Sequence, residues 1–307
     1  MTRSLLSLKD LKSKELLDVF ARIQSLKSKI IRHKEINILK NMVVGLLFTK
    51  PSTRTRTSFE AAVLHLGGKA IYLPSSDLQL KRGEPVKDTA RVLGSYLDGL
   101  VARVYAHQDI VELAEYSGIT VINGLSDLVH PTQAICDLFT IQEVKQKLTG
   151  LKLAFVGDGD NVCNSLFLGC AMCGINMIAA CPEGYFPNQD ILEEGRKIAK
   201  NTGGSLEVVT DPAEAVKGAD VLYSDVWVSM GDESQKEARL KAFQGYQINS
   251  DLLKTANKNA IVMHCLPAHR GLEITDEVIE GPQSVVWQQA ANKMYGAVGI
   301  LDFFLRC

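Results

Sequence analysis

Short runs of apolar residues, many of them β-branched, alternate along the chain with longer stretches whose apolar positions recur at helical spacing. The apolar runs have the length of strands and lie at residues 42–48, 70–73, 100–102, 120–122, 153–156, 177–180, 206–209, 221–223, 260–264 and 285–287. Between them, an amphipathic helix is predicted after Ser13, and Asp211-Pro212 is a typical helix start. Strands that alternate with helices form parallel sheets, so the pattern predicts an α/β protein.

A polar stretch at residues 142–151, which includes Gly150, separates a helix predicted at about 132–142 from the strand that begins at residue 152. Because 307 residues exceed the usual size of one domain, we expect two domains, at 1–145 and 146–287. Residues 288–304 are predicted to form a helix. We assign the whole C-terminal segment 288–307 to the first domain, on which it is expected to pack.

The composition is that of an ordinary globular protein, with 22% charged and 46% hydrophobic residues, and this excludes disorder, collagen and coiled coil. The 34 basic and 35 acidic side chains leave a formal net charge of −1, and no run of Lys or Arg stands out. The chain therefore offers no electrostatic surface for nucleic acid or for an anionic membrane. We expect its partner to be a small molecule.

Residues 161–182 carry no formal charge and are long enough to cross a bilayer. Polar residues within this stretch and a break at Gly174 instead predict a buried helix followed by a strand. The seven cysteines are an odd number, and the first residues lack the pattern of a signal peptide. We therefore expect a cytoplasmic protein without disulfides.

The segment 49–56 places four hydroxyl side chains and two arginines, Arg54 and Arg56, in the turn between a predicted strand and helix. The N–H groups at a helix start attract anions, hydroxyls add donors, and an arginine fork suits phosphate oxygens. The alternative is ordinary capping with solvated arginines, but capping needs only one hydroxyl. The sequence favours an anion site that uses Arg54, with Arg56 in a structural ion pair.

Arg103 ends one predicted strand, and His130 opens a helix after the next one. Taken alone, such an arginine is more often a surface ion pair, and a histidine before proline is more often a capping or packing residue. In open parallel sheets, however, ligands gather at the carboxyl ends of strands. Because both residues and the hydroxyl-rich turn would share that edge, we interpret them as parts of one site.

In the second half, Gly157-Asp158-Gly159 follows a strand in the manner of a dinucleotide-binding motif. The position of the third glycine holds Val162 instead, which makes the motif weak evidence for NAD. The plainer interpretation is a tight turn that leaves Asn161 as a neutral hydrogen-bonding group.

Asp225 follows another predicted strand and precedes the loop 229–231. A carboxylate there can pair with an ammonium group while the loop holds a carboxylate. The alternative is a surface loop whose aspartate caps the next helix. Cys265 at a strand end suggests a nucleophile, and His264 with His269 suggests a metal site. Neither reading finds its remaining partners in the sequence, so Cys265 is interpreted as structural or substrate-lining.

Four segments closely resemble the signatures of the ornithine carbamoyltransferase family: Pro51-Ser52-Thr53-Arg54-Thr55-Arg56, His130-Pro131-Thr132-Gln133, Asp225 with Ser229-Met230-Gly231, and His264-Cys265-Leu266-Pro267. The resemblance implies two Rossmann-like domains with parallel sheets flanked by helices, the first for carbamoyl phosphate and the second for L-ornithine. It implies transfer of the carbamoyl group to the δ-amine of ornithine, giving citrulline, in arginine biosynthesis. It also implies trimers or multiples of trimers with active sites at subunit interfaces, and neither metal nor cofactor.

Residue by residue, the resemblance assigns carbamoyl phosphate to Ser52, Thr53, Arg54, Thr55, Gln79, Arg103, His130, Pro131, Thr132, Gln133, Cys265, Leu266 and Lys293. Gln79 matches a residue that a neighbouring subunit supplies. Ornithine is assigned to Asn161, Asp225, Ser229 and Met230, and catalysis to Arg103, His130, Asp225 and Cys265. One departure is Lys293 in Ala291-Asn292-Lys293, where the family usually has Glu-Asn-Arg. Lysine keeps the charge but loses the planar fork.

Three alternatives remain at this point. The first is a carbamoyltransferase that acts on aspartate, putrescine or an acylated ornithine, and the second is an NAD-dependent dehydrogenase built on Gly157–Asn161. The third is a catalytically silent binding or scaffold paralogue, which only Lys293 suggests.

Overall fold

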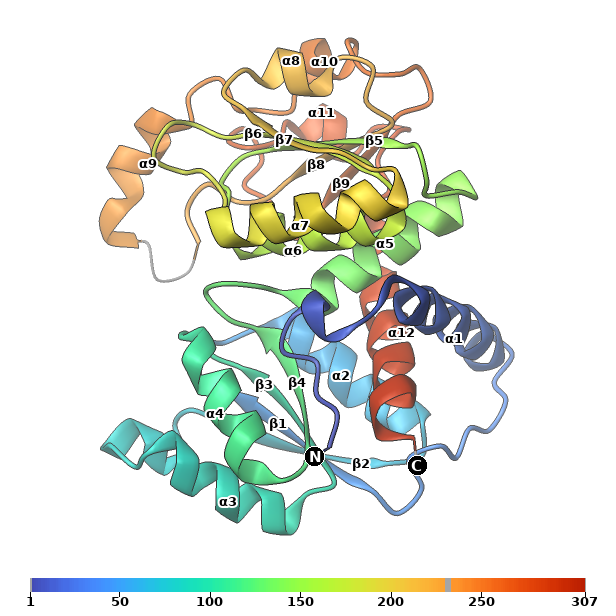
Figure 1. Cartoon of the computed structure of the whole chain (residues 1–307), viewed down its shortest axis with the longest axis vertical. Helices are drawn as coiled ribbons and strands as arrows, with labels where there is room; N and C mark the ends of the chain where they lie inside the picture. The colour runs from blue at the N-terminus through green and yellow to red at the C-terminus, as the bar shows by residue number, and fades with distance from the viewer. Residues whose placement is uncertain (1, 230–232, 307) are drawn as a thin grey trace. The chain divides into compact units, whose positions relative to one another are not determined.

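The computed structural model describes residues 2–229 and 233–306, and its contacts divide the chain into two compact units (Figure 1). The first unit consists of residues 1–139 and 292–307, and the second of residues 140–291. Both divisions fall inside helices, α5 (Pro131–Lys145) and α12 (Val286–Leu305). The first unit therefore includes most of the C-terminal helix.

The first unit contains a parallel four-stranded sheet in the order β2 (Lys69–Pro74), β1 (Val43–Phe48), β3 (Gly99–Arg103), β4 (Thr120–Leu125). Strands β3 and β4 are buried along their whole length, and β1 along all but its first residue, which explains their near-continuous apolar sequences. Strand β2 lies at the edge, and Ile71 on it is 45% exposed. An apolar sequence in a strand therefore does not show whether that strand lies in the centre or at the edge of the sheet.

The helices of the first unit are α1 (Ser13–Ile31), α2 (Thr53–His65), α3 (Val86–Tyr96), α4 (His107–Ser117), and parts of α5 and α12, with short 3-10 turns at Leu8–Asp10 and Gln79–Arg82. Helix α3 packs directly on α4, as Figure 1 shows at the lower left. A Cβ atom on Gly94 would lie only 1.8 Å from the carbonyl oxygen of Ser117, so this close approach requires glycine. Gly299 plays the same part where α12 packs against Ile23 of α1.

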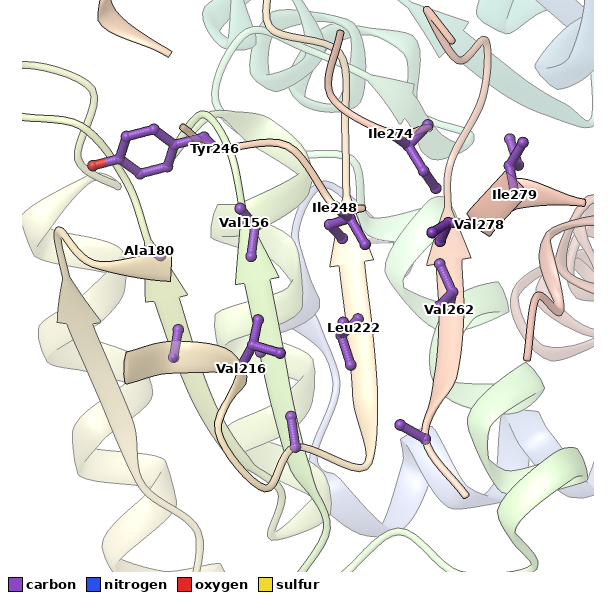
Figure 2. Close-up of a cluster of buried hydrophobic side chains, with 14 of the residues drawn as sticks. Val156, Ala180, Val216, Leu222, Tyr246, Ile248, Val262, Ile274, Val278 and Ile279 are labelled. Atoms are coloured by element: carbon purple, nitrogen blue, oxygen red, sulfur yellow. The ribbon is translucent and has the colours of Figure 1, made fainter. Parts of the chain in front are cut away.

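The second unit contains a parallel five-stranded sheet in the order β7 (Leu206–Val209), β6 (Asn176–Ala180), β5 (Lys152–Val156), β8 (Val221–Ser224), β9 (Ile261–His264). Its helices are α6 (Asn161–Cys173), α7 (Gln189–Thr202), α8 (Pro212–Val216), α9 (Lys236–Ala242), α10 (Ser250–Leu253) and α11 (Asp276–Ile279), with a 3-10 turn at Glu233–Gln235. Figure 2 shows Val156, Leu222 and Val262 projecting from three strands into one apolar cluster. Val216, the last residue of helix α8, and Ile248, in the segment between α9 and α10, complete that cluster.

In each sheet the first strand in the chain is central: the strands that follow it are added on one side, and the later strands on the other side. In the first unit this switch lies between β1 and β3, and in the second between β5 and β8. Loops at such a switch diverge to opposite faces of the sheet and leave a crevice at the carboxyl ends of the strands. Ser52 and Arg103 follow or end the first pair of strands, and Asn161 and Asp225 follow the second pair.

Nine of the ten predicted strands are confirmed, with ends that differ by at most three residues. The predicted strand at 285–287 is wrong, because helix α12 already begins at Val286. Its sheet character is limited to one bridge between Ser284 and Val262, followed by a hydrogen bond from Val285 N–H to the Val262 carbonyl. A run of three apolar residues is too short to separate a strand from the first turn of a buried helix.

The uncharged stretch 161–182 forms the buried helix α6 and strand β6, as predicted. Gly174 ends α6 with φ of +68°, a conformation that favours glycine. Every residue of α6 is buried, which explains why the helix is apolar on all sides. Within the described residues, no helix is both long and apolar enough to cross a membrane.

Candidate active site

The hydroxyl-rich segment forms the start of helix α2. Ser52 caps the helix, and its Oγ accepts a hydrogen bond from Thr55 N–H at 3.2 Å. The first turn contains no acidic residue, so its N–H groups and the positive end of the helix dipole face no carboxylate from their own turn. Thr53 is exposed and Thr55 is buried in this turn. The turn has the features of an anion cradle.

The two arginines of this helix differ in their surroundings. Arg56 forms an ion pair with Glu60 at 3.4 Å, and its guanidinium lies 3.7 Å from the centre of the Tyr72 ring. The structural ion pair predicted for Arg56 is thereby confirmed. Arg54 is half-buried and, among the described residues, pairs with no carboxylate. Arg54 is thus the cation of this turn that keeps its charge for a ligand.

His130 and Arg103 lie at the carboxyl ends of neighbouring strands. Arg103 is 7% exposed at the end of β3, and its carbonyl accepts a hydrogen bond from Thr49 N–H at 2.9 Å. His130 is 4% exposed and precedes Pro131, the first residue of α5. Burial lowers the pKa of His130 well below its usual value, and the positive charges of Lys293, Arg103 and Lys50 lower it further. The ring is therefore neutral near pH 7, yet it can still donate one hydrogen bond.

Lys293 joins this group from helix α12. Its ammonium donates a hydrogen bond to Gln133 Oε1, and Gln133 Nε2 donates one to Asp137 at 2.8 Å. All three side chains are buried. In the same turn of α5, the thiol of Cys136 donates to the Thr132 carbonyl at 2.9 Å. Burial raises the pKa of Cys136 to about 12, so this cysteine is an inert neighbour.

Gln79 stands apart from these residues within one chain. It is exposed at the start of a 3-10 turn, and its Oε1 accepts a hydrogen bond from Arg82 at 3.3 Å. In the described part of the chain it has no hydrogen bond to any other residue assigned to carbamoyl phosphate.

In the second unit, Asp225 and Cys265 meet at the ends of the paired strands β8 and β9. Asp225 is 6% exposed, and its Oδ1 accepts hydrogen bonds from its neighbour Val226 N–H at 2.7 Å and from Cys265 Sγ at 2.8 Å. Cys265 is half-buried. The pair presents a carboxylate and a thiol at the same edge of the sheet, and a carboxylate can pair with an ammonium group.

His264 fixes the backbone that carries Cys265. Its Nδ1 accepts a hydrogen bond from Leu266 N–H at 2.9 Å, and its Nε2 lies 3.2 Å from Glu273 Oε1. Asp225, His264 and Cys265 have potential ligand atoms within 4.8 Å of one another. Because both ring nitrogens of His264 are already hydrogen-bonded, this group is not interpreted as a metal site. His269, also considered as a ligand, instead lies 3.8 Å from the other oxygen of Glu273.

The loop after β5 holds residues that the sequence interpretation did not assign. Asp158 forms a buried ion pair with Arg239 of helix α9, whose guanidinium also donates to the Trp227 carbonyl at 3.1 Å. Asp160 caps α6 by accepting from Val162 N–H at 3.1 Å, and its Oδ2 lies 3.5 Å from Ser229 Oγ. In the sequence, the only signal for them was their place in the glycine-rich turn.

Among the residues assigned to ornithine, Asn161 is 9% exposed at the start of α6, and Ser229 approaches the adjacent residue, Asp160. Asn161 and Asp225 follow the paired strands β5 and β8. The structure therefore brings Asn161, Asp225 and Ser229 to the same end of one sheet. Met230 lies outside the described residues.

Comparison with known proteins finds two family domains along the chain, of which the second includes the C-terminal helix that the contacts assign to the first unit. Residues 3–143 match the family described as the carbamoyl-P binding domain of aspartate/ornithine carbamoyltransferase, and residues 149–304 match its Asp/Orn binding domain. An ornithine carbamoyltransferase of Methanosarcina acetivorans is 48% identical over 306 residues, covering 100% of both chains. One from Archaeoglobus fulgidus is 50% identical over 299 residues, covering 97% of this chain and 96% of that protein.

Solved structures show the same relationship. The ornithine carbamoyltransferase of Pyrococcus furiosus is 46% identical, with a TM-score of 0.96 over 99% of this chain and 97% of that one. The anabolic enzyme of Campylobacter jejuni is 41% identical, with a TM-score of 0.93 over 99% of each chain. The resemblance seen in the sequence motifs is confirmed: the chain belongs to the aspartate/ornithine carbamoyltransferase family.

Proposed function

We propose that the chain transfers the carbamoyl group of carbamoyl phosphate to the δ-amine of L-ornithine, giving L-citrulline and phosphate. The observation that carries this proposal is the contact of Asp225 with Cys265 in the second unit. A buried carboxylate there attracts the ammonium groups of ornithine and repels the side-chain carboxylate of aspartate. Relatives that match nearly the whole chain bear the name ornithine carbamoyltransferase.

The first unit supplies the groups that carbamoyl phosphate requires. The N-terminus of α2, with Ser52, Thr53, Thr55 and Arg54, is suited to the phosphate oxygens. Arg103 and neutral His130 are suited to the carbonyl oxygen, which becomes an oxyanion when the amine attacks. Pro131, Thr132 and Gln133 form the first turn of α5 directly after His130, and Lys293 donates a hydrogen bond to Gln133.

The reaction needs no covalent enzyme intermediate. The neutral δ-amine attacks the carbonyl carbon, a tetrahedral oxyanion forms, and its collapse breaks the bond to the phosphate oxygen. An alkylammonium with a pKa of about 10.4 is only about 0.1% neutral near pH 7.4, which costs roughly 4 kcal/mol. In this proposal Asp225 and Cys265, which are in hydrogen-bond contact, orient the diamine and accept the proton that the attacking nitrogen releases. Leu266 follows Cys265 in the same loop, where its N–H donates to His264 Nδ1.

We extend the proposal to assembly and physiology. Leu64 of α2 and Ile71 of the edge strand β2 are 62% and 45% exposed, which is consistent with an interface between copies of the first unit. Exposed Gln79 would then reach the phosphate site of a neighbouring subunit in a homotrimer or a multiple of trimers. The word anabolic in the name of the Pyrococcus furiosus relative supports a role in arginine biosynthesis. The proposed location is the cytoplasm, as expected from the sequence.

The experiment that tests the function is citrulline formation from carbamoyl phosphate and L-ornithine, with L-aspartate, putrescine and N-acetylornithine in parallel. We expect a carbamoylated product with ornithine alone. Product with another acceptor would replace the substrate assignment, and no product with any acceptor would favour the silent paralogue. An NAD-binding measurement addresses the dehydrogenase alternative, for which Val162 predicts no binding.

A further inference from the structure

The ornithine side of the second unit contains more negative charge than its own cations neutralise. Three aspartates, Asp158, Asp160 and Asp225, belong to the two loops that follow the paired strands β5 and β8. Arg239 forms an ion pair with Asp158. Within the described residues, neither Asp160 nor Asp225 has an ion pair with any cation. Two carboxyl groups are therefore left for a ligand, and an ammonium group bound beside Asp160 would favour its ionised form.

Asp160 lies with the residues that carry the proposed function. It immediately precedes Asn161, and its Oδ2 is 3.5 Å from Ser229 Oγ. Because Val156 of β5 pairs with Ser224 of β8, the two loops leave the sheet side by side. A Cβ atom on Gly157 would lie 3.7 Å from the Asp225 carbonyl oxygen, so the loops approach closely at this point.

The titratable groups around Asp160 are mostly acidic. Burial raises the pKa of Asp160 well above its usual value, and the charges of Asp225 and Asp158 raise it further, whereas Arg239 lowers it. Two thiols, Cys163 and Cys181, also belong to these surroundings. Burial raises the pKa of Cys163, and its hydrogen bond with Cys181 and the charge of Asp160 raise it further. Beyond Asp225 lie Cys265 and the hydrogen-bonded ring of His264. Only Arg239 among these groups carries a permanent positive charge.

We propose that Asp160 is a specificity-determining residue of the ornithine site, where it and Asp225 together balance the two ammonium groups of a diamino acid. This inference rests on the proposed function. Aspartate, with one ammonium and two carboxylates, brings the opposite charge to this site. A monoamino acid such as L-norvaline brings only one ammonium group, so one of the two carboxyl groups would lack its counter-charge.

The test is the substitution Asp160→Asn, because asparagine keeps the shape of the side chain and is an equally good helix cap. Its hydrogen bonds to Val162 N–H and Ser229 are thus retained, and only the charge is lost. We expect KM for ornithine to rise about ten- to a hundredfold at pH 8, the range for one hydrogen bond to a charged group. We expect kcat to change less than about threefold and KM for carbamoyl phosphate not to change.

A second readout separates binding from structure. An aspartate whose pKa is raised on folding costs stability once it ionises, so the ligand-free Asp160→Asn protein should melt at a higher temperature than the wild type at pH 8. The matched control Asp158→Asn removes the carboxylate from the ion pair with Arg239 and should melt at a lower temperature. An unchanged KM for ornithine, or a lower melting temperature with equal losses for both substrates, would overturn the proposal.

A measurement without turnover keeps this test independent of the proposed function. L-Ornithine should raise the melting temperature of the wild type more than L-norvaline does, and Asp160→Asn should lose that difference. If the wild type makes no citrulline but shows this difference, only the proposed reaction fails. If it makes citrulline and both proteins respond equally to the two ligands, the role of Asp160 is refuted.

Discussion

Lys293 donates a hydrogen bond to Gln133 although 160 positions separate the two residues in the chain. Gln133 in turn donates a hydrogen bond to Asp137. A buried ammonium group, an amide and a carboxylate are thus linked in one hydrogen-bonded chain. The amide holds Lys293 in place without neutralising it. The positive charge consequently acts on His130, whose pKa it helps to lower.

Replacement of Lys293 by alanine is expected to lower kcat/KM for carbamoyl phosphate about ten- to a hundredfold, the range for losing one hydrogen bond to a charged group. Lys293→Arg should keep most of the activity, because it keeps the charge. Steady-state kinetics at varied carbamoyl phosphate and saturating ornithine measure both effects.

Lys27 of α1 offers a matched control, since its ammonium donates at 2.8 Å to Oδ1 of Asn292, the residue before Lys293 on α12. Lys27→Ala should leave both KM values unchanged. If Lys293→Ala instead leaves kcat and KM as they are in the wild type, Lys293 does not belong to the site.

The ion pair of Arg239 with Asp158 is nearly buried, with side chains that are 11% and 10% exposed. Arg239→Met leaves a buried carboxylate without its partner, which is expected to destabilise the second unit by about 3–5 kcal/mol. Urea unfolding followed by tryptophan fluorescence reports on this unit, because both tryptophans of the chain, Trp227 and Trp287, lie in it.

The double variant Asp158→Asn with Arg239→Met removes both charges and should regain a large part of the lost stability. Equal stability of the single and double variants would show that Arg239 acts through packing on Tyr185, whose ring it covers at 5.1 Å, rather than through its charge.

The local motifs were the predictable part of the structure. Ser52 caps α2, and Asp211 caps α8 before Pro212, because a helix start is determined by a few consecutive residues. Alternating strands and helices also indicated that Arg103 and Asp225 would stand at the carboxyl ends of strands. Helix caps and strand ends depend on residues that are close in sequence, so the pattern of residue types along the chain predicts them.

The long-range partners were not predictable in the same way. Arg239 lies 81 residues from Asp158, and nothing in either segment indicates that they pair. His264 was considered as a metal ligand, but Glu273 and Leu266 N–H use both of its nitrogens. These contacts form because the folded sheet brings particular loops together. The pattern of a single sequence does not show which loops become neighbours.

The buried ring of His130 should make the stability of the first unit depend on pH. Its pKa is lowered in the folded state, so below the unfolded value of about 6.5 the unfolded chain takes up a proton that the folded chain does not. The free energy of unfolding is therefore expected to fall as the pH drops below 6.5, by up to about 1.4 kcal/mol per pH unit. His130→Asn should lack this contribution.

Urea unfolding of wild type and His130→Asn at pH 7.5 and 5.5, followed by circular dichroism, isolates the effect because other groups titrate in both proteins. A difference between the two proteins that stays constant with pH would mean that His130 is protonated in the folded state.

Activity at saturating concentrations of both substrates is expected to rise from pH 6.5 to 8.5. Over this range His130 is already neutral, so its titration does not limit the rate. The limiting proton is that of the δ-ammonium of ornithine, whose neutral fraction grows about tenfold per pH unit while the pH stays well below 10.4. Measurement of kcat across this range tests the assignment of proton transfer to Asp225 and Cys265. A flat profile under saturation would remove amine deprotonation from the rate-limiting step, because product release or another step insensitive to pH would then control turnover.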